Sequence, residues 1–336
     1  MISVERCRST LILFNEGACS LALRSFLRFN FLAKRLAVGI TVASAFLNYP
    51  TAPAIATEGR AFRDCPVCPL MQIVPSGSVL VGAGALELKQ EGVPLDWMEF
   101  AQPQHTVVIK HDFAVSRYPI TLGEFRQFVR ASGFEPSGGC VHYDGTRWKV
   151  QRKWSWKKTS FEQTDRHPVV CVNWFDAEKY VHWLNRQTGG GYRLLSEDEW
   201  EYAARGGSKD RRYWGDDTDH SIQCQYANGA DFSYSRVYGK DHSANLKCSD
   251  GYAHTSPVGA FRPNAFGLFD MLGNVNQWVD NCVDSDTSSE QRQCRMKGLR
   301  GGAWSDPPWA IRSADRYRDL PSTRCMGIGF RIAKTL

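Results

Sequence analysis

The pattern of apolar and polar positions in residues 71–133 predicts strands followed by a helix. Met71 to Gly82 has the pattern of a strand, a Pro-Ser-Gly turn and a second strand. Gln104 to Val115 alternates apolar and polar positions, which is typical of a strand. A capping box then starts the helix at Thr121-Leu122-Gly123-Glu124, and Gly133 ends it. Its buried face is expected to hold Phe125, Phe128 and Val129.

Two further helices are predicted between residues 173 and 206. The first begins near Asn173 and ends at the run Gly189-Gly190-Gly191. Its apolar stripe consists of Ala177, Tyr180, Val181 and Leu184. The second begins with a capping box at Ser196-Glu197-Asp198-Glu199 and ends at Gly206. Its apolar residues at helical spacing are Trp200, Ala203 and Ala204.

The rest of the chain has little periodicity of either kind. Residues 140–166 are expected to form an irregular loop, and short strands are expected near Thr255–Phe261 and Gly329–Ala333. A few helices, scattered strands and long loops predict one α+β domain over residues 65–336, after a short polar lead-in at residues 57–64. Loops of this length need an additional constraint, and disulfides or bound ions could supply it.

Charge and hydropathy set the first 56 residues apart. They hold six of the 41 basic residues and two of the 35 acidic ones, so 35 basic and 33 acidic residues follow. Such a balance gives no sign of the basic patch that nucleic acid requires, and no nucleic-acid partner is expected. The basic pair Lys34-Arg35, the apolar run Leu36–Leu47 and the site Ala54-Ile55-Ala56 predict a signal peptide over residues 1–56.

The apolar run is shorter than the roughly 20 residues that a membrane-spanning helix needs. We therefore expect a periplasmic or secreted protein without a membrane anchor once the signal is cleaved. The alternative for this run is an uncleaved anchor or a buried segment.

Cysteine usage agrees with export. Nine cysteines follow Ala56, and in an exported protein that many indicate disulfides. Nine is an odd number, so at least one is left over. The pair in Cys65-Pro66-Val67-Cys68 is interpreted as a structural disulfide, with a redox or metal role as the open alternative.

An ordered series of motifs resembles the formylglycine-generating enzyme, or sulfatase-modifying factor, family. The resemblance covers most of the chain after the signal and implies a single domain related to C-type lectins, low in regular secondary structure. The matching segments are Val74–Ser78, Tyr118–Thr121, His167–Trp174, Tyr192–Gly206, Tyr226–Gly229, Pro257–Gly259, Phe266–Trp278, Arg300–Trp304 and Gly327–Arg331.

The resemblance implies structural calcium, which takes about six to eight oxygen ligands. At the family's first site the matching ligands are the side chains of Asn228 and Asp250 and the carbonyls of Gly229 and Tyr252. At the second they are Asp270, the carbonyls of Gly273 and Val275, and Gln277, which stands in place of the family's usual Glu. An amide gives one neutral oxygen, so the second site should bind more weakly. The alternative is that all are turn-forming residues.

The catalytic cysteine pair of the aerobic members is missing. Those thiolates bind copper(I), which suits soft sulfur ligands. Residues 301–316 contain no Cys, and the nearest places hold Asp306 and Ile311. Copper is therefore not expected. Iron is not expected either, because none of the eight His has the His-x-x-x-His-x-Glu spacing of a related branch, and each alone is expected to be a surface or packing residue.

The same resemblance implies how the cysteines pair. Three spacings are similar to family disulfides, Cys65 with Cys68 would be the fourth, and Cys325 would stay free. The three spacings are Cys140 with Cys171, Cys224 with Cys248, and Cys282 with Cys294.

Three functions follow as hypotheses. The first is an exported oxidase-type enzyme that modifies a peptide or peptide-derived substrate, with a pocket lined by Trp304, Ser305, Asp306 and Arg316. Asp306 would act as general base or ligand, or else as a turn carboxylate before Pro307-Pro308. Exported relatives that mature a siderophore chromophore or accompany periplasmic reductases also lack the pair. The second is a non-catalytic, calcium-ordered binding or accessory module for a periplasmic partner. The third is sulfatase activation by formylglycine generation with an atypical active site.

Overall fold

The computed structural model describes residues 61–144, 147–239, 248–285 and 294–336, and the signal peptide expected at residues 1–56 lies outside them. The strands are β1 (Ala61–Phe62), β2 (Met71–Val74), β3 (Gly77–Val81), β4 (His105–Ile109), β5 (Phe113–Ser116), β6 (Cys140–Tyr143), β7 (Trp148–Gln151), β8 (Tyr192–Leu194), β9 (Asn276–Ser285), β10 (Cys294–Arg300), β11 (Arg316–Asp319), β12 (Ile328–Phe330) and β13 (Ile332–Thr335). The helices are α1 (Ala85–Gln90), α2 (Leu95–Met98), α3 (Leu122–Ser132), α4 (Trp174–Thr188), α5 (Glu197–Arg205) and α6 (Phe232–Tyr238), with short 3-10 turns η1 (Glu99–Ala101), η2 (Gln223–Gln225) and η3 (Pro308–Ala310).

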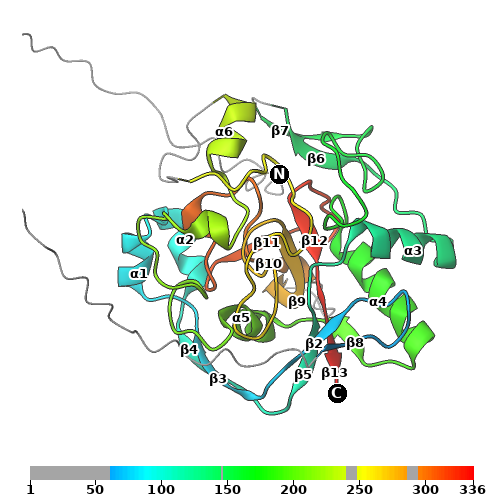
Figure 1. Cartoon of the computed structure of the whole chain (residues 1–336), viewed down its shortest axis with the longest axis horizontal. Helices are drawn as coiled ribbons and strands as arrows, with labels where there is room; N and C mark the ends of the chain where they lie inside the picture. The colour runs from blue at the N-terminus through cyan, green and yellow to red at the C-terminus, as the bar shows by residue number, and fades with distance from the viewer. Residues whose placement is uncertain (1–60, 145–146, 240–247, 286–293) are drawn as a thin grey trace, which may run out of the picture.

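Two sheets form the centre of the α+β fold. One has the order β1-β2-β5-β13-β8, and the other has the order β11-β10-β9-β12 with β12 parallel to β9. The hairpins β3-β4 and β6-β7 complete the strands. In Figure 1, α3 and α4 lie on one side of the central strands, and α1 and α2 lie on the opposite side. Since β12 and β13 belong to different sheets and are separated by one residue, Arg331, the C-terminal segment links the two.

The three capped helices form as predicted. Thr121, Asn173 and Ser196 each accept a hydrogen bond from the N3 backbone N–H. Each N3 carboxylate in turn accepts one from the N-cap backbone N–H, which makes three capping boxes. Each helix ends at a glycine in the left-handed region. The inner faces of α3 and α4 pack into a core that includes Phe125, Phe330 and Trp278, and that of α5 packs into a second cluster that includes Trp200 and Leu272.

Several local predictions need correction. Residues 140–166 are not wholly irregular, because β6 and β7 pair within them. No strand forms at Thr255–Phe261, where Val258 and Gly259 donate to Arg166 and to the Asp270 side chain rather than to a neighbouring strand. The strand expected over Gln104–Val115 is divided between β4 and β5. Part of the expected lead-in also belongs to the domain, since Ala61–Phe62 pairs with β2.

Within the described parts of the chain, no helix has the length and apolar character needed to cross a membrane.

Candidate functional site

Asp306 lies in the loop after β10, between the glycine pair at residues 301–302 and η3. Its Oδ2 accepts hydrogen bonds from the backbone N–H of Ala303 at 3.0 Å and from Nδ2 of Asn276 at 2.9 Å. The residue is only 8% exposed. Two donors on one oxygen fix the orientation of the carboxylate, and a fixed carboxylate can accept a proton at a defined position.

Trp304 is the centre of an aromatic cluster beside this carboxylate. Its indole Nε1 donates to the carbonyl of Met326 at 3.0 Å, which anchors the buried ring. Four rings surround it, with centroids 5.1–6.2 Å away: Phe161, Tyr234, Tyr238 and His254. These rings come from three separate segments, since Tyr234 and Tyr238 both belong to α6, so the cluster exists only in the folded chain.

His254 and Tyr238 form a polar pair within this cluster. A hydrogen bond of 2.9 Å joins the Tyr238 hydroxyl and Nε2 of His254, and the imidazole stacks on Phe161 at 4.5 Å. Burial lowers the pKa of His254 to about 4, and burial together with Tyr143 raises the pKa of Tyr238 to about 12. Both side chains are therefore neutral at pH 7. Sequence analysis missed this pair because no local spacing connects the two residues.

The four predicted pocket residues do not all come together. Trp304, Ser305 and Asp306 are consecutive and buried. Arg316 lies in β11 opposite Arg300 of β10, and its Nε is 3.9 Å from the carboxylate of Glu197 on α5. The placement of Arg316 in the pocket is therefore not supported, because strand pairing carries it to the acidic residues of α5.

Ile311 fills the place that corresponds to the second cysteine of the aerobic enzymes. Its side chain is fully buried. A Cβ added to Gly229 would lie 2.3 Å from Ile311 Cδ1, and one added to Gly302 would lie 3.0 Å from Ile311 Cγ1. The two glycines thus make room for the isoleucine. Among the described residues no group of three or more His, Cys, Asp or Glu could hold a metal ion.

The first predicted calcium set has oxygen atoms without protein donors. Oδ1 of Asn228 is buried and has no hydrogen-bond partner, while its Nδ2 donates to the carbonyl of His254 at 2.8 Å. In the described part of the chain, no backbone N–H donates to the carbonyls of Gly229 or Tyr252. Buried oxygens rarely stay unsatisfied. These three oxygens, together with Asp250, therefore fit a hard cation such as calcium.

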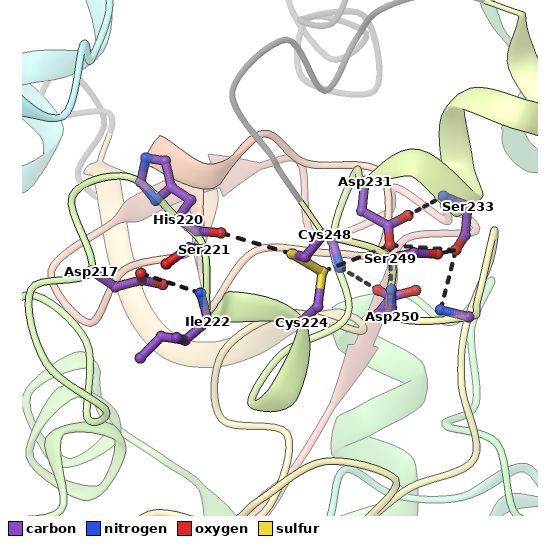
Figure 2. Close-up of a disulfide and its surroundings, with 12 residues drawn as sticks. Asp217, His220, Ser221, Ile222, Cys224, Asp231, Ser233, Cys248, Ser249 and Asp250 are labelled. Carbon is purple, nitrogen blue, oxygen red and sulfur yellow. Dashed lines mark hydrogen bonds between the residues drawn. A yellow bond between two sulfur atoms is a disulfide. The ribbon is translucent and has the colours of Figure 1, made fainter. Parts of the chain in front are cut away.

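Two carboxylates stand together beside this set (Figure 2). The backbone N–H of Asp250 donates to Oδ2 of Asp231, the N-cap of α6, and Asp250 itself accepts from Gly229 and Tyr252 at 3.3 and 2.7 Å. Burial and the neighbouring Asp231 raise the pKa of Asp250 to about 8. A cation bound here would relieve the repulsion between the two carboxylates. Asp231 was not identified from the sequence, where it has the pattern of an ordinary helix cap.

The second predicted set differs, because the protein's own atoms use its oxygens. Oε1 of Gln277 accepts from Trp200 at 2.8 Å and from Arg331 at 2.7 Å, and the carbonyl of Gly273 accepts from Val275. Arg331 also donates to the carbonyl of Asp270 at 3.1 Å. Burial lowers the pKa of Arg331 to about 9, so the guanidinium stays charged at pH 7.

This guanidinium is a fixed cation at the second set. The carboxylate of Asp270 accepts from the N–H of Gly259 at 2.8 Å, and burial raises the pKa of Asp270 to about 6. These contacts give no support to calcium at Asp270, Gly273, Val275 and Gln277.

The four expected disulfides are present: Cys65–Cys68, Cys140–Cys171, Cys224–Cys248 and Cys282–Cys294. The expectation that Cys325 stays free is wrong, because Cys325 is also disulfide-bonded.

The fold and site define a class: an α+β domain related to C-type lectins, with its candidate functional residues on long, hydrogen-bonded loops. The chain belongs to the sulfatase-modifying factor family, since the family model described as "Sulfatase-modifying factor enzyme 1-like domain" matches residues 59–336.

Curated relatives include active and inactive proteins by name. A formylglycine-generating enzyme from Streptomyces coelicolor is 29% identical over 321 residues, covering 84% of this chain and 95% of that protein. "Inactive C-alpha-formylglycine-generating enzyme 2" of Mus musculus is 27% identical over 303 residues, covering 80% of this chain and 86% of that protein. Among solved structures, PvdO from Pseudomonas aeruginosa is 33% identical with a TM-score of 0.65, covering 83% of this chain and 98% of PvdO.

Proposed function

We propose that this chain is an exported modifier of a peptide or peptide-derived substrate that works without copper(I). The observation that carries the proposal is Asp306, a fixed carboxylate at the place of the first catalytic cysteine, while Ile311 fills the second place. Two thiolates are what a cuprous ion needs, and neither position supplies sulfur. The four disulfides between described cysteines favour an oxidising, exported compartment.

The proposed chemistry is an oxidase-type step. The substrate would lose two electrons and two protons. Dioxygen would accept the two electrons and two protons and become hydrogen peroxide. Asp306 would accept one of the protons as general base, held in place by Asn276 and Ala303. The ring of Trp304, with His254 and Tyr238 both neutral, would give the substrate an aromatic wall.

Complementation of a strain that lacks this protein tests the proposal. Asp306→Asn keeps the size of the side chain and an oxygen that can accept from Asn276 and Ala303, but it removes the basic carboxylate. We expect it to fail to complement, so that a peptide-derived compound two hydrogens heavier than its product accumulates in mass spectra. General-base removal lowers turnover by about 10²- to 10⁴-fold. Asp96→Asn, at an exposed position of α2, is the matched control and should complement fully. Equal complementation by both variants would refute a catalytic Asp306.

The non-catalytic binding module is the second candidate. The fully buried Ile311 favours it, and so does the likeness to a mouse relative named as inactive. Full activity of Asp306→Asn in the strain would support this candidate over the first.

A third candidate is formylglycine generation at an atypical site, as the names of several relatives suggest. Incubation of the protein and copper with a sulfatase peptide containing Cys-x-Pro-x-Arg tests it. We expect no loss of the thiol by mass, and conversion of the peptide would establish the third candidate in place of the first.

For calcium, we propose occupancy of the first set only: Asn228, Gly229, Asp250 and Tyr252. The ion would hold the segments that carry Asn228 and Asp250 together and neutralise the carboxylates of Asp231 and Asp250. Calorimetric titration of the calcium-stripped protein should give one site per chain. Two sites would show that the second set also binds.

A further inference from the structure

A surface cleft of about 600 Å³ opens beside the first calcium set. The residues that line the cleft do not include Asn228 or Gly229. Asp306 contacts the segment that carries these two residues, because its carbonyl accepts a hydrogen bond from the N–H of Ala230 at 3.0 Å. Its volume falls in the range of about 300–1,000 Å³ that is usual for small-ligand sites. Nothing in the proposed chemistry at Asp306 uses this cleft.

The cleft offers one cation and two aromatic rings to a ligand. Arg262 is exposed, its guanidinium lies 5.5 Å from the centroid of the Tyr226 ring, and none of the described carboxylates is within ion-pair distance of it. Tyr252 and Phe261 form the apolar wall, with ring centroids 6.0 Å apart at 68°. The guanidinium donates one long hydrogen bond, to the Tyr226 hydroxyl at 3.5 Å, and its other N–H groups are suited to a planar anion that carries an apolar group.

A calcium ion held by the first set would have coordination positions left for further ligands. Asn228, Gly229, Asp250 and Tyr252 can supply about four or five oxygens, and calcium takes about six to eight. Asp250 and Tyr252 line the cleft as well as belonging to the ligand set. Water or a ligand in the cleft would supply further oxygens.

We propose that the cleft binds a peptide carboxylate, held between Arg262 and the calcium ion, with its apolar side chain against Tyr252 and Phe261. Binding depends on calcium, because without the ion the carboxylate would lose one of its two proposed positive partners. The inference rests on the proposed calcium site and not on chemistry at Asp306. It gives the proposed peptide-derived substrate, or the partner of a binding module, an anchoring point.

Isothermal titration with N-acetyl-L-phenylalanine tests the proposal, and N-acetyl-L-phenylalaninamide provides the same ring without the charge. With calcium present, we expect the carboxylate to bind and the amide to bind at least about tenfold more weakly. Arg262→Gln should weaken carboxylate binding by about 10- to 100-fold, since hydrogen bonds to charged groups contribute about 1.5–3 kcal/mol. The matched control is Arg130→Gln, at an exposed position of α3 that contributes nothing to the cleft.

A second probe separates the two possible sources of the carboxylate. N-acetyl-aspartyl-phenylalaninamide carries it on a side chain, and N-acetyl-L-phenylalanine carries it at a C-terminus. Calcium-dependent binding of either probe that is lost in Arg262→Gln supports the proposal and identifies the source. Equal binding of acid and amide, binding unaffected by chelation, or an unchanged affinity in Arg262→Gln would overturn it.

The calcium titration shows which proposal has failed. If calcium does not bind, the calcium site and the cleft inference both fall, while the role of Asp306 is still tested by complementation. If calcium binds and neither carboxylate does, only the cleft inference falls.

Discussion

Arg331→Lys should destabilise the protein far more than its conserved charge suggests. The buried guanidinium donates four hydrogen bonds, and the acceptors come from three parts of the chain. They are Oε1 of Gln277 at 2.7 Å and the carbonyls of Ser116, Phe269 and Asp270 at 2.8, 2.6 and 3.1 Å. The planar fork of an arginine matches such a divergent set, and a single ammonium does not.

The size of the effect follows from the bonds that are lost. The lysine ammonium does not reach as far as the guanidinium and can keep hydrogen bonds to about two of the four acceptors. Each hydrogen bond from a charged donor contributes about 1.5–3 kcal/mol, so the free energy of unfolding should fall by about 3–6 kcal/mol. That is a large part of the 5–15 kcal/mol that is roughly typical of a whole domain. At about 2 °C for each kcal/mol in a domain of this size, the Tm should fall by about 6–12 °C.

Differential scanning calorimetry and urea unfolding measure both quantities, and Arg130→Lys on α3 is the matched control. The control should change the free energy of unfolding by less than about 0.5 kcal/mol. A loss below about 1 kcal/mol in Arg331→Lys would show that the four hydrogen bonds are not the main role of this residue. Recovery of the wild-type Tm on addition of calcium would also contradict the reasoning, because it would show that the ion can replace the guanidinium.

The remaining predictions concern the calcium set, the disulfide beside it and the packing behind Asp306. Because the pKa of Asp250 is raised to about 8, calcium must displace its proton, so the affinity for calcium should fall about tenfold for each pH unit from 8 to 6. For the same reason the free energy of unfolding of the calcium-free protein should fall as the pH rises from about 4 to 8. Calorimetry measures both quantities. Replacing Cys224 and Cys248 by Ser should lower the free energy of unfolding by about 3–4 kcal/mol, as urea unfolding would show. Gly229→Ala should lower the free energy of unfolding by about 1–3 kcal/mol, and adding Ile311→Val to the same chain should restore part of it. Strictly additive losses in the double-mutant cycle would show that residues 229 and 311 are not in contact.

The sequence predicted those structural features that a few neighbouring residues determine. The three capping boxes and their glycine ends are local, so the bounds of α3, α4 and α5 follow almost directly from the pattern. The strands β9 and β10 were not predicted, because β9 lies between β10 and β12 and its buried residues therefore do not alternate clearly with polar ones. The mixture of a few helices and scattered strands predicted the α+β class, and the family resemblance supplied the three longer disulfide pairings, which periodicity alone could not.

The candidate site was predictable only in part. Trp304, Ser305 and Asp306 are consecutive, so the motif that identifies one of them as a candidate identifies all three. Arg316 is ten residues further on, and only the pairing of β11 with β10 shows that it faces α5 instead. Tyr238 and His254 have no motif of their own and meet through tertiary packing. In sequence the two calcium sets differ by Gln277, which predicted weaker binding at the second set, and the hydrogen bonds of Arg331 and Trp200 show why its oxygens are already used.

The two predicted cation positions show how a chain with long loops can be ordered in two ways. At the second set, Arg331 supplies a permanent positive charge and saturates the oxygens around it. Nearby loops are held in the same manner, as when Asn264 donates to the carbonyls of Ala203 and Ala204 and accepts from Phe266 and Leu268. At the first set, by contrast, no donor among the described residues reaches Oδ1 of Asn228 or the carbonyls of Gly229 and Tyr252. The order of that loop should therefore depend on an added ion, and it is this loop that borders both the candidate catalytic carboxylate and the cleft.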